Sequence, residues 1–109
     1  QIEAANGVGA QQVELCTAEY AEMTLSARAA HGDGAQKAAS EVSRIAQAAA
    51  HARKLGLIVA AGHGLTYRNI GALAAIPDIS EFNIGHNIIS RSVFVGLNQA
   101  VREMSEAIK

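Results

Sequence analysis

The sequence has little cysteine, few aromatic residues, almost no net charge and no long apolar segment. Its single cysteine, Cys16, cannot form a disulfide within the chain. The formal net charge of -1 at pH 7 gives no basic surface, which argues against nucleic acid and anionic membranes as partners. No run of 18 apolar residues predicts a transmembrane helix, and no signal-peptide pattern opens the chain. These absences favour a cytoplasmic protein in a reducing compartment.

About half of the residues are apolar and alanine is used heavily, which is typical of a helix-rich globular protein. The chain opens at Gln1, and small apolar residues at helical spacing are already present over residues 2–8. Gly7 and Gly9 then stop this pattern, as at the end of a helix. We therefore expect the chain to be a segment of a longer protein.

Three short segments have the pattern of β-strands. Residues 12–17 and 79–85 alternate between apolar and polar positions, which indicates strands with one buried face. Between them, residues 57–61 form a short apolar run that includes β-branched residues, as in a fully buried strand.

Helices are predicted between and after these strands. Apolar residues recur at helical spacing over residues 36–54 and, more briefly, over residues 67–75. Thr66 can cap the second of these helices, and Tyr67 and Asn69 either belong to its first turn or shape the loop. One continuous helix is expected over residues 90–108. Its predicted apolar stripe consists of Val93, Leu97, Val101, Met104 and Ile108.

Residues 18–35 show neither pattern, and we predict a long loop with at most one helical turn around residues 22–29. Long loops in compact domains often cover binding sites. His31 lies in the glycine-rich part of this segment and is expected to be solvated. His51 lies off the apolar stripe of the following helix and is expected to be exposed.

The predicted order alternates strands and helices, with only a few residues before each strand, which requires parallel strands joined by right-handed crossovers. Parallel sheets are normally covered on both faces, whereas these helices suffice for one face. A (β/α)8 barrel of about 250 residues would supply the rest. We therefore predict an α/β fold in which residues 1–109 form the last three βα units of a single (β/α)8 TIM barrel domain, whose N-terminal half is absent from this chain.

Two glycine–histidine pairs follow predicted strands. His63 stands between Gly62 and Gly64, so its backbone can approach a ligand closely. Gly85 and His86 form the second pair, at the end of the next strand. In a parallel barrel both pairs would meet at the C-terminal mouth, where active sites of this fold are built, and free N–H groups at such junctions favour anions.

Glu14 is predicted to point toward the same interior, because Val13 and Leu15 occupy the apolar face of its strand. A carboxylate in that position needs a partner or a chemical role. A buried ion pair with an interior arginine or lysine is the structural alternative to catalysis. Glu81 and Asn83 fit interior hydrogen bonds as well as ligand contacts.

Two long segments carry a family resemblance. Residues 2–21, IEAANGVGAQQVELCTAEYA, and residues 61–104, which contain AGHGLTYRN and NIGHNII, resemble the C-terminal part of the pyridoxine 5'-phosphate synthase family of vitamin B6 biosynthesis. The resemblance implies a (β/α)8 barrel that condenses 1-deoxy-D-xylulose 5-phosphate with 3-amino-2-oxopropyl phosphate. The products would be pyridoxine 5'-phosphate, inorganic phosphate and water. It also implies no metal or organic cofactor and assembly into a homo-octamer.

The resemblance also implies roles for individual residues. His63 would be the proton donor, and Glu14 would stabilise the transition state. Gly64, Gly85 and His86 would bind 3-amino-2-oxopropyl phosphate. The other proton-accepting histidine and glutamate of the family belong to the N-terminal half, so we expect the present chain alone to be inactive.

Two other classes of function stay open on the sequence. His63, His86 and Glu14 could instead ligate zinc in a hydrolase, because zinc commonly takes three such ligands and a water molecule. Another phosphate-binding barrel enzyme would use the same glycines. Finally, the chain could be a structural or assembly fragment without catalytic activity of its own.

Overall fold

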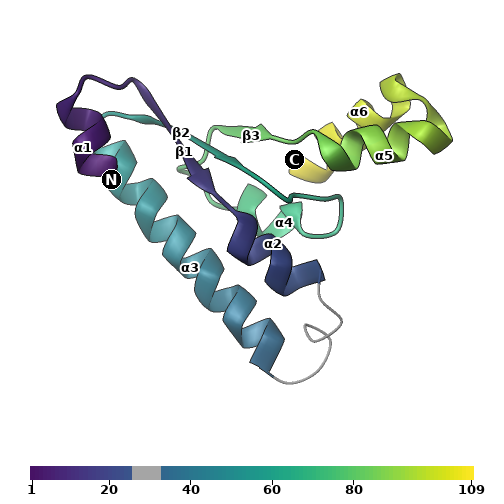
Figure 1. Cartoon of the computed structure of the whole chain (residues 1–109), viewed down its shortest axis with the longest axis horizontal. Coiled ribbons are helices and arrows are strands. Elements are labelled where there is room, and N and C mark those ends of the chain that lie inside the picture. The colour runs from purple at the N-terminus through teal and green to yellow at the C-terminus, as the bar shows by residue number, and fades with distance from the viewer. Residues whose placement is uncertain (26–32) are drawn as a thin grey trace.

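The computed structural model describes residues 1–25 and 33–109. Helices and strands alternate along most of the chain, and Figure 1 labels them. They are α1 (Ile2–Gly7), β1 (Gln12–Cys16), α2 (Ala18–Leu25), α3 (Asp33–Lys54), β2 (Ile58–Gly62), α4 (Ile70–Ala74), β3 (Glu81–Asn83), α5 (His86–Val95) and α6 (Leu97–Ile108). The predicted α/β class and all three predicted strands are confirmed, although β3 is shorter than the alternation over residues 79–85 indicated.

The three strands form one parallel sheet in the order β1-β2-β3, as the alternation of strands and helices predicted. In the register of this sheet, Cys16 lies beside Gly62, and Gly62 lies beside Asn83. The last residues of all three strands therefore share one edge of the sheet. The loops that carry His63 and His86 leave from this edge.

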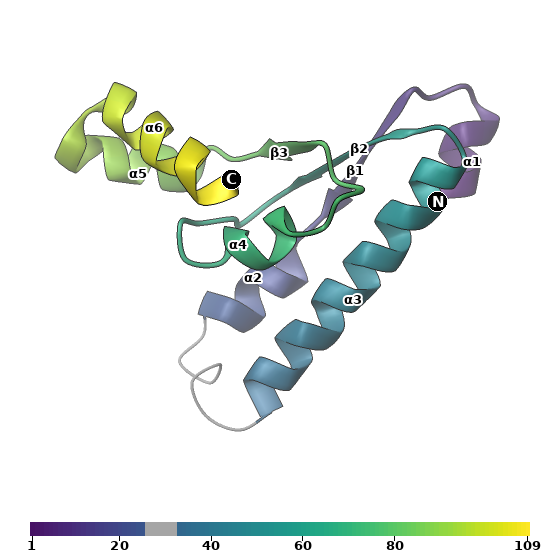
Figure 2. The ribbon, with the colours of Figure 1, turned by 180° about the vertical axis from the view of Figure 1, so that it is seen from behind.

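The hydrophobic core lies on one face of the sheet. In the views of Figures 1 and 2, α3 and α4 lie on the same side of the strands, and the α5–α6 hairpin lies beyond their carboxyl ends. The apolar strand residues pack there against buried residues of α3, α4 and α6. The members from the strands and the nearest helices are Val13, Leu15, Val59, Ala61, Phe82, Ile45, Ala49, Ile70, Leu73 and Met104.

The opposite face of the sheet is polar and exposed at β1 and β3. Glu14 lies on this face, as the strand alternation predicted, and Gln12 Nε2 donates to Glu81 Oε1 across it at 3.1 Å. In the described part of the chain, β1 and β3 have no further strand beside them. A hollow of about 770 Å³ lies along β1, lined by α1, β1 and α3.

The segment predicted as a long loop is partly helical. Residues 18–25 form α2, and α3 already begins at Asp33, so the loop prediction is wrong at both ends. The reason is tertiary packing, because Tyr20 and Ala21 are each only 3% exposed. His31 lies outside the described residues. His51 is exposed, as predicted, with its Nε2 3.6 Å from Glu3 Oε1.

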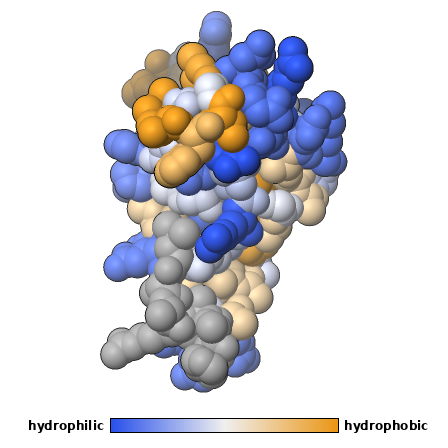
Figure 3. All heavy atoms as spheres, turned by 90° about the vertical axis from the view of Figure 1, so that its right-hand side faces the viewer, coloured by the Kyte–Doolittle hydropathy of each residue, from blue (hydrophilic) through white to orange (hydrophobic). Residues whose placement is uncertain are grey.

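The prediction of one continuous last helix is wrong as well. Gly96 has a φ of 82° and separates α5 from α6, so the expected apolar stripe is divided between two helices. Met104 is 2% exposed, whereas Val93 and Phe94 are 79% and 83% exposed. Figure 3, viewed from the side on which the α5–α6 hairpin lies, shows a cluster of hydrophobic surface at one end of the molecule. No helix within residues 1–25 and 33–109 combines the length and apolarity needed to cross a bilayer.

Candidate active site at the carboxyl edge of the sheet

Glu14 and Asn83 meet across the middle strand. The Nδ2 group of Asn83 donates a hydrogen bond to Glu14 Oε2, although β2 runs between their strands. Gly62 makes this contact possible, because a Cβ at that position would lie 3.1 Å from Glu14 Oε1 and 3.2 Å from the Asn83 Cβ. The partner of Glu14 in this structure is therefore an amide and not a cation, and the side chain remains exposed on the open face.

The backbone at His63 is unusual. Its φ is 95°, and His63 is the one residue other than glycine with a positive φ in the described chain. Such conformations are costly for L-residues and cluster at functional sites. The next residue, Gly64, has a φ of 73°, and a Cβ there would lie 2.6 Å from the Ala21 Cβ of α2. The imidazole of His63 is exposed on a turn whose backbone the protein closely constrains.

Asn69 closes the loop that follows His63. This residue is 5% exposed, and its Oδ1 accepts a hydrogen bond from Thr66 N–H at 2.7 Å. Its Nδ2 donates to Gly64 O at 3.3 Å and to Thr24 Oγ1 at 3.1 Å. The expectation that Asn69 shapes the loop is confirmed. The helix predicted over residues 67–75 begins only at Ile70, with Asn69 at its N-cap, so the predicted start is wrong. The hydroxyl of Thr66 nevertheless accepts a hydrogen bond from Arg68 N–H at 3.3 Å, within the turn before α4.

Tyr20 fastens the same loop from α2. Its buried hydroxyl donates to Asn69 O at 2.6 Å, and burial raises the pKa of this phenol above its usual value of 10.0. The protonated phenol is the form that can donate this hydrogen bond. The loop is thus held on two sides, by the side chain of Asn69 within it and by α2 beneath it.

The second glycine–histidine pair has a different environment. Gly85 has a φ of -121°, outside the left-handed region that favours glycine, and a Cβ at this position would meet no atom within 4 Å. His86 is exposed in the first turn of α5. The neighbouring Asn87 accepts a hydrogen bond from Tyr67 N–H through its Oδ1 at 3.0 Å. This bond connects the loop after β2 to the start of α5, so the two pairs belong to one region of the sheet edge.

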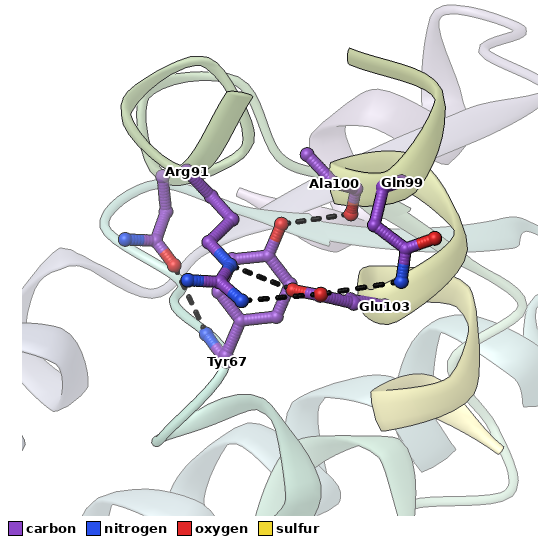
Figure 4. Close-up of polar contacts among 6 residues, drawn as sticks. Tyr67, Arg91, Gln99, Ala100 and Glu103 are labelled. Carbon is purple, nitrogen blue, oxygen red and sulfur yellow. Dashed lines mark hydrogen bonds and ion pairs between the residues drawn. The ribbon is translucent and has the colours of Figure 1, made fainter. Parts of the chain in front are cut away.

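Tyr67 also connects the loop to the helical hairpin, as Figure 4 shows. Its hydroxyl donates to Ala100 O at 2.8 Å. Close by, Arg91 Nε donates to Glu103 Oε2 at 2.7 Å, and Gln99 Nε2 donates to the other carboxylate oxygen of Glu103 at 3.3 Å. The hydrogen bond from Arg91 holds the pKa of Glu103 below its usual value. The Tyr67 bond holds the loop that carries His63 against α6, and the bond between Arg91 and Glu103 joins α5 to α6 within the hairpin.

The zinc alternative finds no support in the geometry. Within residues 1–25 and 33–109, no three histidine, cysteine, aspartate or glutamate side chains are grouped closely enough to hold a metal ion. His63, His86 and Glu14 all belong to these described residues. Glu14 is instead engaged with Asn83.

The sequence predicted that both histidines follow adjacent strands, as the structure has them, but it did not point to Thr17, which is fully buried beside the first pair. Its hydroxyl contacts the carbonyl oxygens of Gly62 and His63. A single threonine at the end of a strand has no pattern that distinguishes this role, since the contact depends on the neighbouring strand. Its position next to the glycine–histidine turn becomes evident only when the strands are placed side by side.

The fold and the site place this chain among parallel α/β proteins with a candidate small-molecule site. Parallel α/β proteins bind small molecules at the carboxyl edge of their strands, and this chain places polar side chains, glycine turns and two exposed histidines at that edge. The model of the family described as pyridoxal phosphate biosynthesis protein PdxJ matches residues 1–109, and the chain belongs to this family. The resemblance found in the sequence is therefore confirmed.

Curated relatives agree with this assignment. The chain is 48% identical over 109 residues to a pyridoxine 5'-phosphate synthase of Prochlorococcus marinus (strain MIT 9313), covering 100% of this chain and 40% of the relative. It is 49% identical over 108 residues to the protein of that name from Coxiella burnetii (strain RSA 493 / Nine Mile phase I), covering 99% and 41%. The chain thus spans about two fifths of the length of these relatives and matches their C-terminal part.

Proposed function

We propose that the complete protein containing this chain is a pyridoxine 5'-phosphate synthase. It condenses 1-deoxy-D-xylulose 5-phosphate with 3-amino-2-oxopropyl phosphate and releases pyridoxine 5'-phosphate, inorganic phosphate and water. The observation that carries the proposal is the match of the entire chain, at 48% identity, to a protein of this name. The polar edge of the sheet supports it, because the residues that the family resemblance assigns to substrate follow the carboxyl ends of adjacent parallel strands.

The proposed architecture is a single (β/α)8 barrel in which residues 1–109 are the last three βα units. Three features support it: a parallel sheet covered by helices on one face, a polar opposite face, and no further strand beside β1 or β3 within the described residues. The hollow of about 770 Å³ along β1 offers space for a preceding unit. In a closed barrel, Glu14 and Asn83 would line the interior.

In this proposal His63 is the proton donor. Formation of an imine, loss of water and phosphate, and closure of the ring each require proton transfer. An imidazole is suited to these steps because its ordinary pKa lies near neutral pH. The exposed side chain and constrained backbone of His63 support the assignment, since a catalytic group must be held in position yet reach the substrate.

The remaining roles divide between charge stabilisation and phosphate binding. Glu14 stabilises the transition state, and the hydrogen bond from Asn83 supports this role by fixing one carboxylate oxygen. Gly64, Gly85 and His86 bind 3-amino-2-oxopropyl phosphate. The open space around Gly85 and the start of α5 immediately after it support an anion-binding role, because free N–H groups point outward at the beginning of a helix.

The proposal also covers the setting of the reaction. The substrates are small phosphate compounds, no metal or organic cofactor takes part in the chemistry, and nucleic acids and membranes are not partners. The complete protein acts in the cytoplasm as a homo-octamer. The exposed apolar side chains of Val93 and Phe94 support self-association, because large exposed apolar groups often mark interaction surfaces.

The test is formation of pyridoxine 5'-phosphate from the two phosphate substrates by the purified complete protein. We expect turnover by the complete protein, none by residues 1–109 alone, and a loss of at least about 100-fold in kcat for His63→Ala. The thermal midpoint of that variant should stay within about 3 °C of the parent. A complete protein that makes no product would refute the function, and near-normal turnover of His63→Ala would remove this residue from the mechanism.

A further inference from the structure

Thr17 contacts the backbone on both sides of His63. Thr17 lies between β1 and α2 and is 0% exposed. Its hydroxyl lies 2.8 Å from Gly62 O and 2.7 Å from His63 O. Its backbone N–H donates to Gly62 O as well, at 2.9 Å. Because a hydroxyl group has one proton to donate, the two carbonyl oxygens share it.

These two carbonyl groups belong to the peptide units that flank the His63 Cα. Each peptide unit is planar, so the orientations of the two planes define φ and ψ of His63. Those angles in turn set the direction of its Cα–Cβ bond and hence of the imidazole. A single hydroxyl that contacts both units therefore constrains φ and ψ of His63, and with them the direction in which its side chain leaves the backbone.

His63 needs such a constraint, since a φ of 95° is unfavourable for any residue with a Cβ. Conformations of this kind persist only when the surroundings over-determine them. Gly64 and Asn69 restrain the chain after His63, whereas Thr17 is the described side chain that bonds to the carbonyl of His63 itself. Its complete burial keeps water from taking the place of the hydroxyl.

We propose that Thr17 is a positioning residue, whose hydroxyl holds His63 in its positive-φ conformation and so aims the imidazole at the substrate. The catalytic half of this inference rests on the proposed function, in which His63 transfers a proton. The conformational half does not, because it concerns only the backbone of His63. The two halves are tested by separate measurements.

The conformational test is a crystal structure of the complete protein carrying Thr17→Val, which keeps the shape of the side chain and removes the hydroxyl. We expect φ of His63 to leave the positive region, and Thr17→Ser to retain it. A φ that stays near 95° in the valine variant would overturn the proposal. Thr17→Ala removes the same donor without adding volume and decides the matter if the valine variant does not fold.

The kinetic test compares the same variants in the synthase assay. A misplaced catalytic group costs up to about 100-fold, so we expect kcat of Thr17→Val to fall about 10- to 100-fold, with KM for both substrates changed less than about 3-fold. Thr17→Ser should restore most of the lost kcat. In a His63→Ala background, Thr17→Val should have no further effect on kcat, because the group that it positions is gone. Equal losses in both backgrounds would contradict the positioning role.

A stability control separates positioning from general weakening of the fold. Ile45 of α3 is a core residue, 4% exposed, and its hydrocarbon side chain cannot hydrogen-bond to either glycine–histidine pair. The substitution Ile45→Val removes one buried methyl group. We expect this variant to lower the thermal midpoint and leave kcat unchanged. If the unsubstituted protein makes no pyridoxine 5'-phosphate, the proposed function fails, whereas the φ of His63 in Thr17→Val still decides the role of Thr17.

Discussion

The two glycine–histidine pairs look alike in sequence and differ in structure. Around His63 the backbone has positive φ at two successive residues, and a Cβ on Gly64 would lie 2.6 Å from that of Ala21. Around His86 the backbone has no positive φ, and a Cβ on Gly85 would meet nothing within 4 Å. We call the first pair closed, because neighbouring residues constrain its backbone, and the second pair open, because nothing lies within 4 Å of a Cβ at Gly85; both histidine side chains are exposed.

Gly64 and Gly85 are therefore glycines for two different reasons. Gly64 is required by the fold, since its φ of 73° and the proximity of α2 both exclude a side chain. Nothing in the described structure demands a glycine at Gly85, so its requirement would come from a ligand that approaches its backbone. A substitution at Gly64 should therefore lower stability, whereas one at Gly85 should weaken substrate binding with little effect on stability.

The largest expected effect is that of Gly64→Ala on stability. Positive φ costs an alanine about 1–2 kcal/mol, and the contact with Ala21 adds about 1–3 kcal/mol of overpacking. We expect the free energy of unfolding of the complete protein to fall by about 3 kcal/mol, measured by urea denaturation. Gly71→Ala is the matched control, because Gly71 lies exposed in α4 with open space at its Cβ, and should stabilise by about 0.5–1 kcal/mol. A stable Gly64→Ala variant would mean that the first pair is not closed.

The next effect concerns the bond from Tyr20 that fastens the first pair. Tyr20→Phe leaves Asn69 O without its donor and should cost about 1–1.5 kcal/mol near neutral pH. Because burial raises the pKa of Tyr20 in the folded state, its contribution is complete below the ordinary pKa of 10.0 and is lost as the pH rises through the raised value. The difference in thermal midpoint between parent and variant should thus shrink above pH 10. A difference independent of pH up to 11 would contradict this.

A smaller effect, of unusual sign, is expected at His63 itself. Glycine accepts positive φ without strain and alanine does not, so His63→Gly should be more stable than His63→Ala by about 1 kcal/mol. Both variants should lose turnover. Thermal denaturation of the two complete proteins side by side measures the difference, and an alanine variant equal to or more stable than the glycine variant would show that the protein does not impose this φ.

The smallest effect on stability is expected at the open pair. Gly85→Ala should change the free energy of unfolding by less than about 0.5 kcal/mol, because its φ is negative and an added Cβ would meet no atom within 4 Å. The same methyl should raise KM for 3-amino-2-oxopropyl phosphate, since it occupies space assigned to the ligand. Gly7→Ala adds a methyl in equally open space on α1, remote from the site, and should leave KM unchanged. An unaltered KM in Gly85→Ala would exclude close approach of the phosphate there.

Much of this arrangement follows from patterns that are local in sequence. Alternation in β1, the apolar run of β2 and the order of elements predicted parallel strands, and parallel strands bring Glu14, His63 and His86 to one face or edge. The closed character of the first pair could not be predicted. It depends on Thr17 and Tyr20, which reach the loop from segments more than 40 residues away in the chain.

Two of the errors in element prediction, at α2 and at the last helix, have physical causes of the same kind. Residues 18–25 have weak amphipathicity, and α2 is stabilised by burial of Tyr20 and Ala21 against the rest of the fold. The break at Gly96 was visible as a glycine inside an apolar helical pattern. The positive φ of Gly96 and the reversal of the chain there could not be predicted, because they depend on the packing of α6 against the core through Met104.

The central claim is that the closed and the open pair jointly hold one phosphate group beside the imidazole of His63. A crystal structure of the complete protein grown with inorganic phosphate tests it most directly. We predict a phosphate within hydrogen-bond distance of the backbone N–H groups of both Gly64 and Gly85, with His86 also in contact. A phosphate bound elsewhere, with none at the carboxyl edge of β2 and β3, would contradict the account.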